Sequence, residues 1–389
     1  MGDIKRIIEY IKQFICYGDA KAAEQIGYTA DESLWPKFTV IIVPNGHLGK
    51  DIVYPSMKSL KPRVLEQTAR RKHKTYIIEE DIIYAAFFFI SRAEELINTE
   101  RDEHGRFAAR FSILGKRNRM SIPLIDEYSR TVCKLLDKEL PKRGFDHIYL
   151  THDIDVLTQY RHLRGALGGF YRGEKDAVLD SWRDIRLDPA YTFPWLIKQD
   201  RQVPQAETIY FIKHTHGRGL DYPQYCLHSK DWQRTKTLLL NNGAQLGLHS
   251  SYYGSLPTVP DKLHRSHYLR CSVAQMAKLA QAGITDDFTM GFADQAGFRL
   301  QTTRAVRWIN PKTYELTALT LHPLTIMDCT LSNSNYMNLT EDEAYYYCQH
   351  LIDKTRLYHG DLCLLWHNSN PTANPWFKSL YSQLINMLK

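Results

Sequence analysis

The sequence lacks a long hydrophobic run. Its longest uninterrupted apolar stretch, Ile82 to Ile90, is far shorter than the roughly 20 residues that a membrane-spanning helix needs. Between Ile4 and Ile15 the apolar residues recur with helical spacing and do not form the continuous core of a secretory signal. We therefore expect a cytoplasmic protein without a membrane span.

Cysteines are few, and no two of them form a C-x-x-C pair. The seven cysteines are odd in number and widely scattered, which indicates reduced thiols and excludes a disulfide framework or a cysteine-rich zinc site. Phosphate-binding loops and dinucleotide fingerprints are also missing. Ser250 and Ser251 lie in no G-x-S-x-G elbow, so the sequence disfavours a serine hydrolase.

Charge gives little indication of a partner. The formal net charge of +7 comes from 50 Lys and Arg against 43 Asp and Glu, interleaved along the chain. We therefore do not expect a nucleic-acid partner, and the oligomeric state stays open. With 389 residues the chain exceeds the size at which single cores usually stop growing, which favours two domains or a barrel with an addition.

Residues 1–145 predict an N-terminal α+β domain. Helical patterns cover the first residues and the stretches 81–98 and 125–139, and residues 38–43 form a β-rich segment. Its role is not evident from the sequence. The segment 101–107 combines both charge signs with Gly105 and Phe107, and predicts a solvated turn or a loop that reaches toward the other domain. We expect this domain to pack near the mouth of the active site.

Residues 146–389, after a boundary at 141–144, alternate between strand and helix patterns. The predicted strands are 147–152, 208–213, 244–249, 314–320 and 362–367. Ser272 and Thr340 have the spacing of helix N-caps, and Thr340 forms a capping box with Glu343. This alternation predicts a parallel sheet with outer helices, closed into a barrel.

The first of these strands ends in two carboxylates, Asp153 and Asp155. On an extended chain residues i and i+2 face the same side, so the two carboxylates would share one face. Such a pair suits a metal ligand beside a general base. A strand end followed by an Asp N-cap is the alternative.

Two further predicted strands end in histidine. One reads Gly247-Leu248-His249-Ser250-Ser251-Tyr252, and the last reads Leu364-Leu365-Trp366-His367-Asn368. Reactive groups of parallel α/β folds lie at the carboxyl ends of the strands. The sequence therefore predicts that these histidines and the Asp pair share one site.

In their order and placement these motifs, with Gly297-Phe298-Arg299, resemble the polysaccharide deacetylases, the NodB-homology family of metal-dependent carbohydrate esterases. The resemblance covers about 148–368, and a bacterial branch with T-H-D-x-D and L-W-H-N motifs is the most similar. It implies a distorted (β/α) barrel and hydrolysis of N-acetyl, or less favoured O-acetyl, groups on a sugar or polysaccharide. It also implies a divalent metal, which we expect to be zinc.

The same resemblance implies roles for single residues. Asp153 would be the general base with Arg299 beside it, and His367 would be the general acid, oriented by Asp328. Asp155 and His249 would bind the metal. The residues that we expect to contact the carbohydrate are Tyr252, Trp366 and Asp294.

One position departs from the family pattern. The second histidine of the family motif is replaced by Tyr253, whereas catalytic zinc generally keeps three protein ligands. His267 is the favoured substitute, because it lies in the same connection as His249; His264 is its competitor. The pair His214 and His216 could also bind a metal. The missing histidine leaves an alternative function, a catalytically inactive carbohydrate-binding protein.

Overall fold

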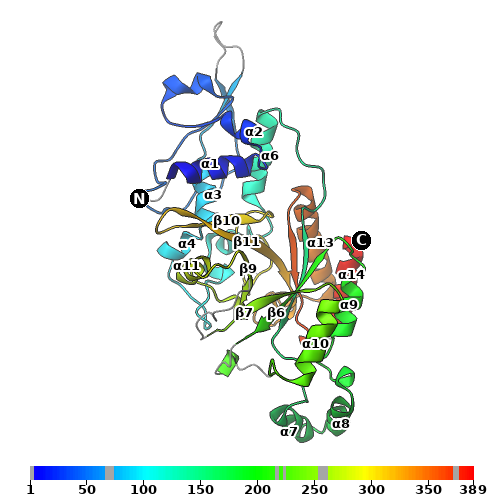
Figure 1. The fold of residues 1–389 in the computed structure, drawn as a ribbon. Coiled ribbons are helices and arrows are strands. Elements are labelled where there is room, and N and C mark those ends of the chain that lie inside the picture. The colour runs from blue at the N-terminus through cyan, green and yellow to red at the C-terminus, as the bar shows by residue number, and fades with distance from the viewer. Residues whose placement is uncertain (1–3, 66–73, 215–218, 222–224, 253–261, 371–375) are drawn as a thin grey trace.

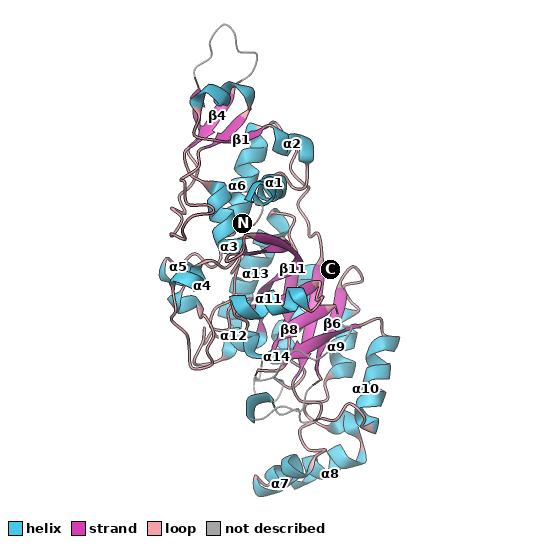
Figure 2. Cartoon of the chain, turned by 60° about the vertical axis from the view of Figure 1, so that its left-hand side comes forward, coloured by secondary structure: helices cyan, strands magenta, loops and turns pink. Residues whose placement is uncertain are grey.

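The computed structural model contains two β-sheets at different levels of an elongated molecule (Figures 1 and 2). The structure describes residues 4–65, 74–214, 219–221, 225–252, 262–370 and 376–389. Within these ranges, no helix has both the length and the apolar character needed to cross a membrane.

The N-terminal part has the predicted α+β character. Its sheet has the strand order β1-β2-β4-β3, in which only β3 and β4 pair antiparallel. The strands are β1 (Ile26–Tyr28), β2 (Val40–Ile42), β3 (Arg63–Leu65) and β4 (Thr75–Ile78). The helices are α1 (Ile4–Ile15), α2 (Ala20–Glu24), α3 (Ile82–Ile90), α4 (Glu94–Ile97), α5 (Ile113–Lys116) and α6 (Leu124–Leu135), with 3-10 turns η1 (Glu32–Lys37) and η2 (Ala109–Phe111).

Helix α3 forms the centre of this part. It coincides with the longest apolar run of the sequence, and every one of its residues is buried. A helix that is apolar on all sides is stable only inside a core. Asp81 caps its first turn by accepting a hydrogen bond from the Tyr84 backbone N–H at 2.9 Å.

The second sheet closes into a barrel. Its order is β10-β11-β12-β5-β6-β7-β8-β9, and β9 also pairs with β11. The seven strands of the ring pair parallel, whereas β10 lies outside it and pairs antiparallel with β11. The strands are β5 (Ile148–Ile154), β6 (Glu207–Lys213), β7 (Gln245–Ser250), β8 (Leu263–Ser266), β9 (Asp286–Met290), β10 (Val306–Asn310), β11 (Glu315–Met327) and β12 (Leu362–Leu365). The predicted (β/α) barrel is confirmed.

The helices of this part cover the ring or lie beyond its lower end (Figure 1). They are α7 (Leu163–Tyr171), α8 (Lys175–Arg183), α9 (Phe193–Asp200), α10 (Lys230–Asn241), α11 (Val273–Gln281), α12 (Asp328–Ser332), α13 (Glu341–Leu357) and α14 (Phe377–Leu388), with 3-10 turns η3 (Ile185–Leu187), η4 (Gly219–Asp221) and η5 (His267–Leu269). The predicted caps are confirmed, since Ser272 and Thr340 each form a capping box.

The hairpin β10–β11 connects the barrel with the N-terminal part. One hydrophobic core includes Phe87 of α3 together with Trp308 of β10 and Leu319 of β11. The ring of Phe87 stacks on Tyr314 at a centroid distance of 5.5 Å. The Trp308 indole N–H donates to the Ser91 carbonyl at 3.3 Å. The N-terminal part is therefore packed on the barrel through buried apolar surface.

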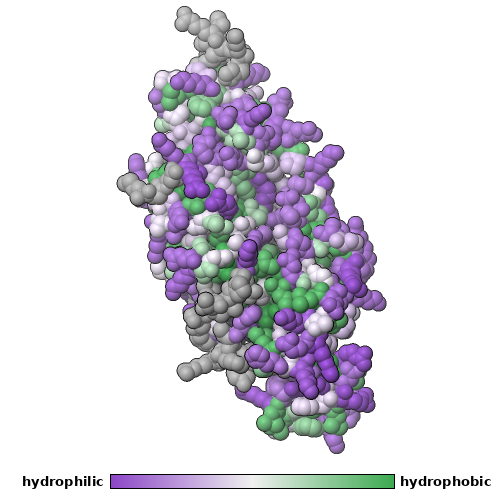
Figure 3. Space-filling view, in the orientation of Figure 1, coloured by the Kyte–Doolittle hydropathy of each residue, from purple (hydrophilic) through white to green (hydrophobic). Residues whose placement is uncertain are grey.

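Helices α7 and α8 project from the opposite end of the molecule. They follow β5, the strand that carries the Asp pair, and they form the lower tip in Figures 1 and 2. Large apolar side chains are exposed on both helices, among them Leu163 and Tyr171 of α7 and Trp182 of α8. Figure 3 shows this tip as a mixture of apolar and polar surface.

Candidate active site

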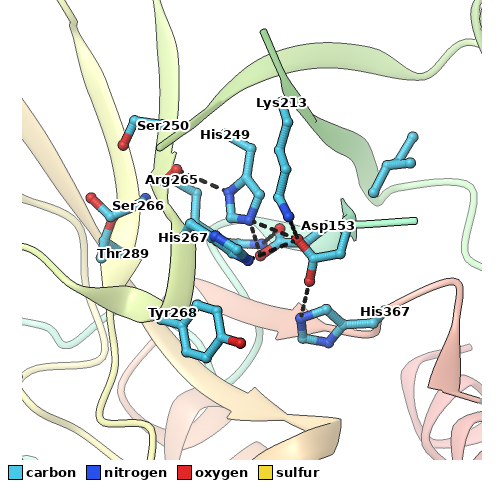
Figure 4. A network of polar contacts seen from close by, with 12 residues as sticks. Asp153, Lys213, His249, Ser250, Arg265, Ser266, His267, Tyr268, Thr289 and His367 are labelled. Carbon is cyan, nitrogen blue, oxygen red and sulfur yellow. Dashed lines mark hydrogen bonds and ion pairs between the residues drawn. The ribbon is translucent and has the colours of Figure 1, made fainter. Parts of the chain in front are cut away.

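Polar side chains converge at the carboxyl ends of β5, β7 and β8. Asp153 is the penultimate residue of β5, and Asp155 follows the strand on the same side. His249 is the penultimate residue of β7, and His267 is the first residue of η5, directly after β8. Since β5, β6, β7 and β8 are successive neighbours in the ring, these side chains meet at one end of the barrel (Figure 4).

Asp155, His249 and His267 are close enough to share one metal ion. The Nε2 atoms of His249 and His267 lie 3.4 and 3.2 Å from Asp155 Oδ1, and the three ligand atoms lie within 4.8 Å of one another. Within the described residues, the buried atoms His249 Nε2 and Asp155 Oδ1 form no hydrogen bond of good geometry, although the Lys213 ammonium forms an ion pair with this oxygen. Two imidazoles and a carboxylate are typical ligands of catalytic zinc. These three residues therefore fit a divalent metal ion.

The second ring nitrogen of each histidine is already bound. His249 Nδ1 lies 3.1 Å from the Arg265 carbonyl, to which it donates, and His267 Nδ1 lies 2.8 Å from Asp221 Oδ1. Such contacts fix ring orientation and leave Nε2 for a metal. Burial lowers the pKa of His249, which favours the neutral imidazole that binds a metal.

The ammonium group of Lys213 also reaches this site. It comes from the last residue of β6, is largely buried, and lies 3.0 Å from Asp155 Oδ1. Burial alone would raise the pKa of Asp155, but its interactions with Lys213 and His267 outweigh burial and hold this pKa well below its usual range. Asp155 is therefore a carboxylate, the form that binds a cation.

Asp153 is buried beside an arginine. Arg265 of β8 is fully buried, and its Nη1 lies 2.9 Å from Asp153 Oδ1. The other oxygen, Oδ2, lies 3.5 Å from His249 Nε2. Burial alone would raise the pKa of Asp153, whereas its electrostatic interactions with His249, Arg265 and His367 lower it below its usual value. Asp153 is therefore ionised and able to accept a proton.

His367 lies on the other side of Asp155. Its Nδ1 is 2.8 Å from Asp328 Oδ1, and its Nε2 is 3.8 Å from Asp155 Oδ2. Asp328 also accepts a hydrogen bond from the His367 backbone N–H at 2.8 Å. Burial alone would lower the pKa of His367, but Asp328 and Cys329 raise it well above its usual value. His367 therefore holds a proton at neutral pH.

Asp153, Asp155, His249, His267 and His367 line a cavity of about 230 Å³. Tyr268 also lines it, and the backbone φ of 59° at Tyr268 is rare for a residue other than glycine. Arg106 of the N-terminal part reaches the same cavity. Its guanidinium donates to the Tyr268 carbonyl at 3.2 Å and to the Tyr336 hydroxyl at 3.0 Å. Loop 101–107 therefore contributes to the wall of the cavity.

The expectation that Arg299 lies beside Asp153 is wrong. Arg299 Nη2 lies 2.8 Å from Glu95 Oε1 of α4, and its Nη1 donates to the Gly291 carbonyl at 2.7 Å. A buried guanidinium needs a carboxylate partner, and α4 supplies one at the junction of the two parts. Arg265 takes the position beside Asp153.

Asp294 does not face the cavity. Its oxygens accept hydrogen bonds from the backbone N–H groups of Ala109 at 2.8 Å and Arg110 at 3.2 Å. The predicted contact of Asp294 with carbohydrate is therefore wrong, because this carboxylate binds the start of η2. It attaches the N-terminal part to the barrel.

The expectation that Trp366 contacts the carbohydrate is wrong. Trp366 is fully buried, and its ring packs between Phe377 and Tyr381 at centroid distances of 5.5 and 5.1 Å, so it cannot stack on a sugar. The contact of Tyr252 with carbohydrate stays a prediction; its ring lies 5.6 Å from that of Tyr268, and its hydroxyl donates to the His104 carbonyl at 3.0 Å. Tyr268 is the aromatic residue that lies beside the candidate ligands.

The competing ligand His264 points elsewhere. Its Nδ1 lies 2.6 Å from Asp287 and its Nε2 lies 2.8 Å from Ser250 Oγ, so both ring nitrogens are bound outside the triad. The alternative histidine pair consisted of His214 and His216, and His216 lies outside the described residues. Tyr253 also lies outside them. Two other clusters among the described residues could hold a metal; they are Asp328, Cys329 and His367, and Asp146, His147 and Asp361.

Comparisons with known proteins give limited matches. Residues 2–141 match a family of unknown function (DUF7033). No curated protein matches the chain. A crystal structure of a Mycobacterium smegmatis protein, provisionally named a polysaccharide deacetylase, is similar with a TM-score of 0.39 and 13% identity, and the match covers 64% of this chain and 90% of that one.

Proposed function

We propose that the protein is a metal-dependent hydrolase that removes N-acetyl, or less favoured O-acetyl, groups from a sugar or polysaccharide, as the polysaccharide deacetylases do. The convergence of Asp155, His249 and His267 between the ionised Asp153 and the protonated His367 carries this proposal. A carboxylate base and an imidazolium acid on opposite sides of a Lewis-acid site are groups that support metal-dependent amide hydrolysis.

Asp155 Oδ1, His249 Nε2 and His267 Nε2 would hold the ion, and the mixed nitrogen and oxygen ligands favour zinc. When bound, the ion would polarise the acetyl carbonyl and lower the pKa of a water molecule. Asp221 and the Arg265 carbonyl keep the two imidazoles turned toward it.

Asp153 would take the proton of the attacking water. Arg265 holds Oδ1 of this carboxylate, so Oδ2 is the oxygen left for that proton. His367 would then give its Nε2 proton to the departing amine, while Asp328 keeps the ring oriented through Nδ1. Tyr268 and Arg106 would surround the sugar, and residues 1–145 would thereby shape substrate access as a domain of their own.

Asp328→Asn is expected to shift the alkaline limb of the activity profile to lower pH. Asp328 raises the pKa of His367, so removing its charge makes His367 lose the catalytic proton at a lower pH. The measurement is kcat against pH for both proteins. An alkaline limb that stays in place would show that His367 is not the acid.

The proposal is tested by acetate release from a panel of N-acetylated and O-acetylated sugars and oligosaccharides. We expect release from at least one N-acetylated substrate, loss after dialysis against a chelator, and recovery with about one equivalent of zinc per chain. Release that survives complete removal of metal would contradict the metal-dependent mechanism.

Lys213 favours a second candidate function. Its ammonium lies 3.0 Å from Asp155 Oδ1, where it can neutralise this carboxylate without any metal. In this alternative the protein keeps the cavity, binds carbohydrate and has no catalytic activity. A protein that binds oligosaccharides, purifies without a divalent ion and releases no acetate would favour this alternative.

A further inference from the structure

A second hollow lies next to the candidate active site. It measures about 310 Å³ and is lined along one side by Arg164 and Gly168 of α7 and by Arg172, the residue that ends this helix. This volume lies at the lower end of the range of ligand pockets. Ser369 lines both this hollow and the catalytic cavity, so the two spaces share a wall. We refer to the hollow as the α7 groove.

The sequence of α7 explains why the groove is open and basic. Arg164, Gly168 and Arg172 recur every four residues, so they lie on one face of the helix. A Cβ added at Gly168 would lie 3.2 Å from Arg172 Nη1, so the missing side chain leaves room beside the guanidinium. Large exposed apolar residues such as Leu167 and Tyr171 occupy a different face of α7.

Arg172 is held in place by Glu174. Its Nε and Nη2 lie 3.0 and 2.8 Å from Glu174 Oε2, which leaves the Nη1 edge toward Gly168. None of the described residues that line the α7 groove is acidic. Besides the two arginines, Gln159 and His162 line it with side chains that contain nitrogen. Glu174 offsets part of the charge of Arg172, whereas Arg164 forms no ion pair with a described carboxylate. The Arg164 guanidinium and the Nη1 edge of Arg172 together suit a carboxylate, sulfate or phosphate group.

We propose that the α7 groove is a subsite for an anionic sugar residue, and that the substrate is an acidic polysaccharide that runs from the catalytic cavity along α7. This inference rests on the proposed deacetylase function for the position of the acetylated residue. The assignment of the groove as an anion subsite is independent of that function, because it requires only that a negatively charged sugar binds between Arg164 and Arg172.

The test compares two N-acetylated oligosaccharides of equal length, a neutral chitin fragment and an acidic chain of alternating N-acetylglucosamine and glucuronic acid. We expect the double variant Arg164→Gln/Arg172→Gln to raise KM for the acidic chain about 10-fold and to leave KM for the neutral chain within about 2-fold. The kcat should not change, since neither arginine touches the reacting group. Gly168→Leu, which keeps both charges and fills the groove, should also raise KM for the acidic chain.

The matched control is Arg183→Gln/Arg186→Gln, which removes two charges from the same projecting segment outside the groove. An equal rise of KM in this control, or no rise in the groove variant, would overturn the proposal. The proposal would also be overturned if the groove variant lost binding to phosphatidylglycerol vesicles while its KM for both oligosaccharides stayed unchanged. The groove would then bind a lipid headgroup. If the wild type releases no acetate, the deacetylase proposal fails, and calorimetric binding of the acidic chain still decides whether the groove is a subsite.

Discussion

Asp153→Asn is expected to reduce turnover by on the order of 10³-fold or more while the protein still binds a divalent ion. The amide keeps the shape of the carboxylate but cannot take the proton of the attacking water. Asp153 is also held by Arg265 rather than placed at the centre of the candidate ligands, so its loss should spare the metal. The measurements are kcat and the metal content of the same preparation.

The control for this change is Asp342→Asn, the same substitution at an exposed position of α13, which should leave kcat unchanged. A contrary result is also well defined. If Asp153→Asn purifies without metal while Asp155→Asn retains it, the two carboxylates have exchanged roles.

His249→Ala and His267→Ala are each expected to weaken zinc binding by on the order of 10²-fold or more, with loss of activity in proportion. Each change removes one of only three protein ligands, and three is the usual minimum for catalytic zinc. Asp221→Asn should have a smaller effect, about 10-fold to 100-fold, because Asp221 orients His267 and is not itself one of the three candidate ligands. Zinc affinity can be measured by competition with a chelating dye.

His350→Ala, on the exposed surface of α13, is the matched control and should bind zinc as the wild type does. The three-ligand arrangement would be refuted if His267→Ala bound zinc with unchanged affinity. That result would show that zinc binds without His267, either at Asp155 and His249 with water or at another cluster such as Asp328, Cys329 and His367.

The sequence was sufficient for the parts of the site that depend on local spacing. Asp153 and Asp155 are two residues apart at the end of an extended segment, and this spacing alone puts them on one face. Strands such as β5 and β7 are visible because their runs of apolar and β-branched residues are bounded by turns. The placement of catalytic groups at strand ends follows from the parallel barrel.

The contacts that were missed join segments far apart in the chain. Arg265 reaches Asp153 across the interior of the barrel, and β8, which carries it, spans only Leu263–Ser266 and contains two charged or ionisable residues. One signal in the sequence could have placed Arg265 at the site. Arg265 and His267 are two residues apart, and on an extended chain they therefore face the same side. Lys213 and Asp221 offered no comparable pattern.

The wrong assignments have a common cause. Arg299 and Asp294 both lie where the N-terminal part meets the barrel, and they contact Glu95 and Ala109 there. The spacing of a motif does not indicate which segment covers it in the folded chain. The assignment of Trp366 was wrong for a related reason. Trp366 and His367 directly follow β12, adjacent residues of an extended chain face opposite sides, and His367 takes the side of the cavity.

The most direct test of the central claim is anomalous diffraction at the zinc absorption edge from crystals of the protein supplied with zinc. The account predicts one strong peak within about 2.0–2.2 Å of Asp155, His249 Nε2 and His267 Nε2, with the Lys213 ammonium displaced from Asp155. The account would be contradicted by a structure in which Lys213 keeps its contact with Asp155 at full occupancy and no peak lies beside the two histidines.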